Sequence, residues 1–292
     1  MAVVKRVTGA TGKKTKPKPV EEKVDFALAT EPSEPCTRLG DYIVLLFGEK
    51  KIGKTSLAAQ FDRAYFCRTE SGTKALRVYG SDITSWDMAK AFLKVIRKDK
   101  RFDTVIIDTI DMLYRYCEQA VCRKLGIDDP SEEEWGRGWR AIRSEFEPWL
   151  AALAATGKGL VLISHAGEQE IKTRTGERYH KIMPTMPKQA RDIIEAMVDI
   201  WACYTYDGHK RVLVIRGDDH ISAGHRLTEN FRTPSGEDLE MINMGHNAED
   251  AYKRFVAAFN NRYTPDGKEE RPVGKKTALK QVVRKRLSLD AS

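Results

Sequence analysis

The residues most able to do chemistry form an octapeptide that fits the phosphate-binding pattern G-x-x-x-x-G-K-[ST]. Its members are Gly48, Glu49, Lys50, Lys51, Ile52, Gly53, Lys54 and Thr55. Glycines let backbone N–H groups surround the β- and γ-phosphates of a nucleotide, and the start of a helix adds partial positive charge. Lys54 then reaches the terminal phosphates, the Thr55 hydroxyl can bind Mg²⁺, and Ser56 completes the predicted nucleotide contacts.

The sequence around this loop supports the same interpretation. A strand-like apolar run over 42–47 leads into it, and a helical pattern begins at Ser56. A lysine-rich surface turn would show the same letters without this strand-loop-helix context. No Asn-Lys-x-Asp element follows the loop, so we expect ATP rather than a guanine nucleotide.

A second residue that holds the metal ion is expected at Asp108. The apolar stretch 104–107 predicts a buried strand, and Asp108 ends it 60 residues after Gly48. A carboxylate at this point can hold Mg²⁺ through water, together with Thr55. The predicted cofactors are therefore ATP and Mg²⁺.

A carboxylate that activates the attacking water must come from elsewhere, because Thr109 and not Glu follows Asp108. Glu70 is the first candidate, since it follows a predicted strand at 64–68 and would lie at the carboxyl edge of the sheet. Asp111 is the second, although an acid at a helix start also has an ordinary electrostatic reason. Ser164 and His165 end another apolar strand and can respond to the γ-phosphate there.

The elements that must position these groups alternate between strands and helices, which predicts an α/β fold with a mainly parallel sheet. Asp207-Gly208 between two apolar alternations predicts an antiparallel hairpin on the C-terminal side. The polar segment 166–186 predicts a long loop or hairpin beside the site. The expected strands are 42–47, 64–68, 77–79, 103–108, 159–164, 199–206 and 211–216, and the expected helices are 54–63, 85–98, 110–125, 133–156, 187–198 and 248–261.

Charge is unevenly distributed along the 292 residues, whose net charge is +8. Residues 1–20 carry six cations and no acid, and 268–292 carry eight cations against three acids, so the rest of the chain is slightly acidic. We expect a disordered basic arm over 1–38, an ATPase domain over 39–263 and a basic flexible tail over 264–292. Such arms favour contact with a nucleic acid, although solubilising ends would have the same composition.

Other classes of protein are disfavoured by composition. No apolar tract is long enough for a membrane span, so we expect a cytoplasmic protein with no membrane partner. The five cysteines are scattered without a metal-binding spacing, which argues against a zinc site or a disulfide framework.

These motifs in this order resemble the RecA-like ATPases, and in particular the phage-type nucleotide-binding proteins that act as single-strand annealing recombinases. The resemblance covers residues 40–230 and includes 69–72, 105–108, 162–165, 197–201 and 222–226 besides the phosphate loop. It implies a RecA-like P-loop core, with Glu70 activating water, Ser164 and His165 sensing nucleotide, and 166–186 contacting DNA. Arg226 would act on the nucleotide of a neighbouring subunit in a ring or filament.

The leading hypothesis is thus an ATPase that acts on single-stranded DNA, or RNA in its place, in recombination, annealing or repair. A homo-oligomer and a single-strand-binding protein are the expected partners. Three alternatives stay open: a P-loop motor or loader that remodels protein partners, a nucleotide-gated binding module with negligible hydrolysis, and a small-molecule kinase with Arg174 and Arg178 in a lid.

Overall fold

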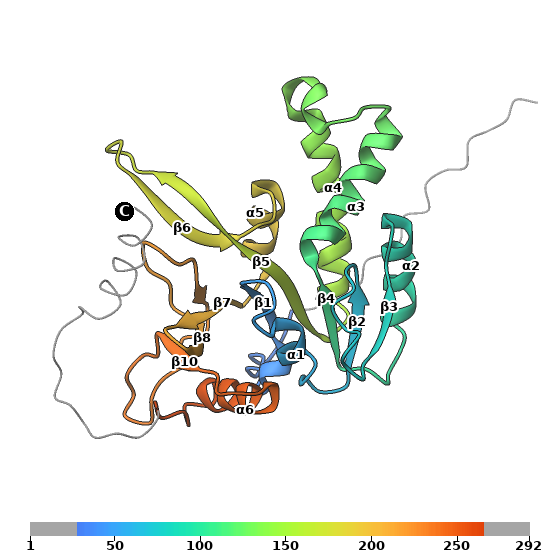
Figure 1. The fold of residues 1–292 in the computed structure, drawn as a ribbon. Coiled ribbons are helices and arrows are strands. Elements are labelled where there is room, and N and C mark those ends of the chain that lie inside the picture. Colours follow the sequence, from blue (N-terminus) through green and yellow to red (C-terminus); the bar gives the residue numbers. More distant parts are fainter. Residues whose placement is uncertain (1–27, 266–292) are drawn as a thin grey trace, which may run out of the picture. The chain divides into compact units, whose positions relative to one another are not determined.

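A mostly parallel β-sheet with helices on both faces forms the body of the protein (Figure 1). The structure is a computed structural model, and it describes residues 28–265. The strands of this part are β1 (Ile43–Gly48), β2 (Ala64–Arg68), β3 (Tyr79–Asp82), β4 (Thr104–Asp108), β5 (Gly159–Lys172), β6 (Arg178–Pro184), β7 (Ile200–Asp207), β8 (Lys210–Val214), β9 (Gly224–His225) and β10 (Met241–Asn243).

Six α-helices accompany these strands in the described part of the chain. They are α1 (Lys54–Ala58), α2 (Trp86–Ile96), α3 (Ile110–Leu125), α4 (Arg137–Ala154), α5 (Lys188–Met197) and α6 (Ala248–Phe259). Short 3₁₀ turns occur at Leu39–Asp41, Pro130–Glu132 and Glu134–Gly136.

The strand order is β10-β8-β7-β1-β5-β4-β2-β3, with β6 joined to β5 and β9 to β7. The strands from β7 to β3 pair in parallel, whereas β8 and β10 add antiparallel pairs beyond β7. The predicted α/β class and the hairpin at Asp207-Gly208 are confirmed. This arrangement is consistent with a RecA-like P-loop core.

Two hydrophobic cores, one on each face, hold the layers together. The helices α2, α3, α4 and α5 bury their apolar sides on one face of the sheet, and α1 and α6 do so on the other. The central strands are apolar on both faces and therefore fully buried: β4 has no exposed residue, and β1 is buried from Val44 onward. Such a sheet presents polar groups only where its strands end.

The helix α4 begins later than predicted. Trp135 and Gly136 both adopt left-handed backbone angles, with φ of 57° and 68°, so the helix starts at Arg137 rather than at 133. The apolar face of α4 is buried, including Phe146 and Trp149, whereas Trp135 is 89% exposed. The turn therefore separates a packed helix from a tryptophan that faces solvent.

The segment after His165 is a two-stranded ribbon. The predicted strand 159–164 continues without interruption to Lys172, turns at 173–177 and returns as β6. Figure 1 shows this ribbon extending away from the sheet. Of the two predicted possibilities for 166–186, a loop or a hairpin, the hairpin is correct. The predicted end of the strand at 164 is wrong, because the alternation of side chains between the two faces continues through polar residues as far as Lys172.

Other differences are smaller. α1 ends at Ala58, earlier than the predicted 63, and the strands β9 and β10 are not predicted. The basic segments 1–20 and 268–292, and with them most of the predicted arm and tail, lie outside the described residues. Contacts divide the chain between Pro35 and Cys36, and residues 28–35 contain no helix or strand.

Within residues 28–265, no helix is both long and apolar enough to cross a membrane. The five cysteines are all free thiols, and four of them are buried.

Candidate nucleotide site

The phosphate loop lies where β1 ends and α1 begins. Gly53 has φ of 114° and nothing within 4 Å of the position of a Cβ atom, so glycine supplies a backbone shape that other residues rarely adopt. Lys51 is also left-handed, with φ of 66°. Gly48 is needed for a different reason: a Cβ there would lie 2.0 Å from the carbonyl oxygen of Tyr204 on the neighbouring strand β7.

Lys54 is the best-defined cation of the loop. Its side chain is only 5% exposed, and Nζ donates hydrogen bonds of 2.8 Å to the carbonyl oxygens of Gly48 and Glu49. Burial lowers the pKa of Lys54 to about 8, against the opposing influence of Asp108 and other nearby acids. The ammonium group is thus held across the loop by the backbone that precedes it.

Thr55 and Asp108 meet at the predicted magnesium position. Thr55 Oγ1 donates a hydrogen bond of 2.8 Å to Asp108 Oδ2, and burial raises the pKa of Asp108 despite that bond. A Cβ atom at Gly72 would lie 3.3 Å from Asp108 Oδ2 and 3.5 Å from Thr55 Oγ1. The glycine keeps side-chain atoms away from both oxygens, so the residues present fit a Mg²⁺ ion held by a hydroxyl, a carboxylate, waters and phosphate oxygens.

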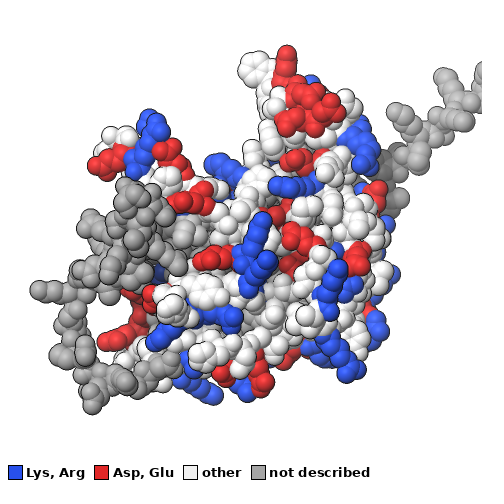
Figure 2. Space-filling model, viewed as in Figure 1, with Lys and Arg blue, Asp and Glu red and all other residues white. Residues whose placement is uncertain are grey.

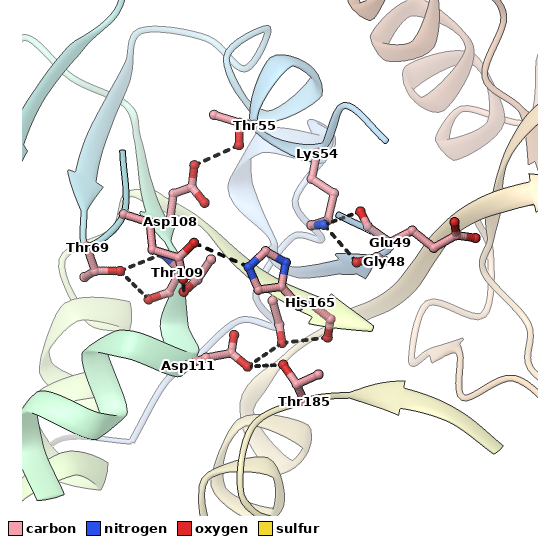
Figure 3. A network of polar contacts seen from close by, with 12 residues as sticks. Gly48, Glu49, Lys54, Thr55, Thr69, Asp108, Thr109, Asp111, His165 and Thr185 are labelled. Carbon is pink, nitrogen blue, oxygen red and sulfur yellow. Dashed lines mark hydrogen bonds and ion pairs between the residues drawn. The ribbon is translucent and has the colours of Figure 1, made fainter. Parts of the chain in front are cut away.

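Glu70 is held beside Asp108 by the adjacent strand end. Thr69 N and Glu70 N donate to the carbonyl oxygen of Asp108 at 2.8 and 3.2 Å, and Thr69 Oγ1 accepts a 2.7 Å bond from Thr109 N. The Glu70 carboxylate accepts a bond of 2.8 Å from Thr109 Oγ1 and lies 3.4 Å from His165 Nε2. Figure 3 shows the Asp108, Thr109 and His165 side chains converging with Lys54 and Thr55 from three strand ends.

Asp111, the second candidate for water activation, has one oxygen engaged in other contacts, whereas its buried Oδ2 has no hydrogen-bond partner among the described residues. Its Oδ1 atom accepts hydrogen bonds from Ser164 Oγ at 3.0 Å and from Thr185 Oγ1 at 2.8 Å (Figure 3). Burial raises the pKa of Asp111, and these two bonds oppose the change. The carboxylate therefore links α3 to the buried end of β5 and to the base of the ribbon.

A cavity of about 820 Å³ unites these groups. It is lined by Lys50, Lys51, Gly53, Lys54, Thr55, Ser56, Glu70, Gly72, Asp108, Asp111, Met112, Arg115, Ile163, His165, Ala166, Thr185, Met186 and Pro187. The phosphate loop forms one wall, and the ends of β2, β4 and β5 form the other. The volume lies within the usual range for small-molecule sites.

Most of the predicted site residues line this cavity. Gly48, Glu49 and Ile52 belong to the phosphate loop without lining the cavity, and Ser164 and Arg226 lie outside it. Ser164 is fully buried and bonds to Asp111, so it lies behind the cavity wall rather than in it. Arg226 lies 3.7 Å from Asp199, just before β7 begins, whereas the phosphate loop is at the other end of the parallel strands. That separation is roughly 16 Å along β1, so Arg226 does not reach the cavity of its own chain.

Several residues of the site were not predicted. Thr109 is buried and does not line the cavity, and the only sequence signal for it is a hydroxyl directly after a predicted carboxylate. Met112, Arg115 and Thr185 carry no signal in the sequence, because only the packing of α3 and the ribbon base brings them to the cavity. Within residues 28–265 no cluster of three or more His, Cys, Asp or Glu could hold a metal ion.

Comparisons with known proteins identify the family. No curated protein matches the chain. A KaiC-like protein from the hyperthermophilic archaeon Pyrococcus horikoshii OT3 is among the similar solved structures, with 15% sequence identity, a TM-score of 0.44, and coverage of 72% of this chain and 88% of that one. Residues 41–227 match the family described as AAA domain. The match spans more than half of the chain, which therefore belongs to the AAA-domain family of P-loop ATPases.

Proposed function

We propose that the protein hydrolyses ATP with Mg²⁺ and couples this reaction to action on single-stranded DNA. The observation that supports hydrolysis best is the position of Glu70. Its carboxylate lies in the same cavity as Lys54, Thr55 and Asp108 and is oriented by Thr109 and His165. A general base opposite a phosphate-binding lysine is the arrangement that directs a water at a γ-phosphate.

Each residue has a distinct task in this proposal. Lys54 binds the β- and γ-phosphates and stabilises the charge that develops on them. Thr55 and Asp108 hold Mg²⁺, which neutralises phosphate charge when it is bound. Glu70 accepts the proton of the attacking water, and Thr109 and His165 orient its two oxygens. His165 also senses the γ-phosphate, with Ser164 supporting its strand from behind.

The ribbon connects this site to a nucleic-acid strand. His165 belongs to β5, which continues directly into the ribbon, and Thr185 N donates a 2.9 Å bond to the carbonyl oxygen of His165 at the ribbon base. The outer part carries Lys172 and Arg174, besides Arg178, which is paired with Glu170 at 3.3 Å. The basic segments at both ends of the sequence add electrostatic affinity for a polyanion. The phage-type RecA-like proteins of recombination, annealing or repair are the class that this combination favours.

An oligomer would give Arg226 a function. Its side chain is 53% exposed, and it lies at the sheet edge opposite the phosphate loop. We propose that it meets the nucleotide of a neighbouring subunit in a ring or filament, where a cation supplied in trans stabilises transition-state charge.

ATP turnover with and without single-stranded DNA, across a range of ionic strength, tests the proposal. We expect turnover that requires Mg²⁺, rises with DNA and loses this stimulation as salt increases. The Lys54→Ala protein provides the control for contaminating ATPases. DNA that neither binds in a salt-dependent manner nor changes turnover would remove the DNA part of the proposal and leave the ATPase part intact.

A second candidate function is a motor or loader that remodels protein partners, and one surface favours it. The end of the α3–α4 pair carries five acids between Asp128 and Glu134, and Figure 2 shows them gathered there. Trp135 is 89% exposed among them. Exposed tryptophan is typical of protein interfaces.

Affinity capture with nuclease treatment distinguishes the two functions. A protein partner that stays bound after nuclease digestion and is lost with Trp135→Ala would favour the motor or loader. Capture that disappears with nuclease would favour the nucleic-acid function.

A further inference from the structure

A second cavity, separate from the nucleotide site, lies at the tip of the β7–β8 hairpin. Its volume is about 410 Å³, and none of the residues lining it is acidic. The side chains relevant here are those of Tyr206, His209, Lys210, Arg211, His246 and Arg254. Three are permanent cations and two more are histidines, so the surface of the cavity is positive.

The cavity opens at the same edge of the sheet as the phosphate loop. In the parallel pairing of β1 with β7, Gly48 is level with Tyr204, so Tyr206 stands two residues beyond the start of the loop. Thr205 Oγ1 donates a 3.2 Å bond to Glu49 Oε1, which connects the hairpin to the loop directly. No lining residue is shared with the nucleotide cavity, and β5 with its ribbon lies on the other side of β1.

A backbone carbonyl positions Arg211. Arg211 Nη1 donates a 2.9 Å bond to the carbonyl oxygen of His246, whereas its buried Nε has no hydrogen-bond partner among the described residues. The start of α6 follows at Ala248 and adds the positive end of its helix dipole. Asp207 at the end of β7 and Asp250 in the first turn of α6 do not line the cavity.

We propose that this cavity binds phosphate groups of a single-stranded nucleic acid. Arginine and lysine together satisfy phosphate oxygens by charge-assisted hydrogen bonds, and the Tyr206 ring offers a surface on which a base can stack. The inference rests on the proposed action on a strand, and it adds a contact on the side of the phosphate loop opposite the ribbon. A nucleic-acid strand bound to both the ribbon and this cavity would cross the edge of the sheet where ATP binds. The same chemistry could serve the phosphates of a free nucleotide, so the experiment separates the two sources.

The test is binding of a fluorescein-labelled oligothymidine strand to the full-length protein, measured by anisotropy at several salt concentrations. Lys210→Glu should weaken binding at least about tenfold and lower the salt slope by about 1 to 2. Lys210→Gln should give an intermediate loss. Lys98→Glu makes the same charge change at an exposed position after α2 and should stay within about twofold of the unaltered protein.

Binding of a fluorescent ATP analogue and ATP turnover without DNA form the second part of the test. Both should be unchanged in Lys210→Glu, which also shows that the variant is folded. Strand binding that is equal in Lys210→Glu and the unaltered protein would overturn this inference while the proposed function stands. Loss of nucleotide binding with strand binding intact would assign the cavity to a free nucleotide and overturn it too. An unaltered protein that binds no strand would refute the proposed DNA function and this contact together.

Discussion

Thr109 Oγ1 donates a hydrogen bond of 2.8 Å to Glu70 Oε1, so the residue directly after the proposed magnesium ligand orients the proposed base. The proposed magnesium ligand and the proposed base therefore lie at the ends of two adjacent strands, β4 and β2. Backbone bonds from Thr69 and Glu70 to the Asp108 carbonyl oxygen fix the same two ends. A carboxylate base placed on β2 thus stays in register with a metal ligand on β4.

Replacing Glu70 by Gln should slow ATP hydrolysis by about 10²- to 10⁴-fold, because the amide cannot accept the proton of the attacking water. ATP binding should be retained, since the phosphate loop is untouched. Single-turnover hydrolysis and equilibrium binding measure the two effects separately. Normal turnover in this variant would exclude Glu70 as the base, and an already negligible turnover in the unaltered protein would favour a nucleotide-gated binding module.

Replacing Asp111 by Asn should have a different signature. Oδ1 of Asp111 already accepts bonds from Ser164 and Thr185, and an amide oxygen can still accept both. We therefore expect basal turnover to fall less than about tenfold, in contrast to the Glu70 variant. If Asp111→Asn loses more turnover than Glu70→Gln when the two are measured in parallel, Asp111 and not Glu70 would be the base.

The hydroxyl of Thr109 should matter through Glu70. Thr109→Val removes the 2.8 Å bond and keeps the shape of the side chain, so we expect a decrease of about tenfold in kcat with little change in KM. Thr109→Ser retains the hydroxyl and should restore most of the rate. Equal losses in both variants would indicate a packing role instead.

Nucleotide affinity should depend on pH because the pKa of Lys54 is lowered to about 8. Below this value the free protein carries the ammonium that binds phosphate, and as the pH rises above 8 the charge is lost, so affinity should fall by up to about tenfold per pH unit. The measurement is Kd for ATP between pH 7 and 9.5. Lys54→Arg keeps its charge throughout this range, and an equally steep profile in that variant would assign the dependence to another group.

Gly48 should be required for the sheet as well as for the phosphate loop. A Cβ atom would lie 2.0 Å from Tyr204 O, so Gly48→Ala must push β1 and β7 apart. We expect a loss of about 2 to 3 kcal/mol in the free energy of unfolding, or about 6 °C in Tm. Gly224→Ala on β9 meets nothing within 4 Å and should leave Tm nearly unchanged. Similar values for both glycines, measured by thermal denaturation, would contradict the steric argument.

The parts of the fold that were predictable are those encoded over short stretches of sequence. The phosphate loop is contiguous, and Glu70 and Asp108 follow apolar runs long enough to define strands. The ribbon and its contacts were less accessible, because alternation through polar residues is a weak strand signal and Thr185 reaches Asp111 only after β6 folds back. Arg226 shows the limit most clearly: its motif says nothing about which edge of the sheet it occupies.

The uninterrupted course of β5 has a mechanical consequence. From His165 to Lys172 the strand continues for roughly 23 Å. A tilt of about 10° at its buried end would displace the far end by about 4 Å, more than the length of a hydrogen bond. Loss of a single phosphate beside His165 could thereby produce a displacement at the far end of the ribbon that is large enough to break and remake contacts there.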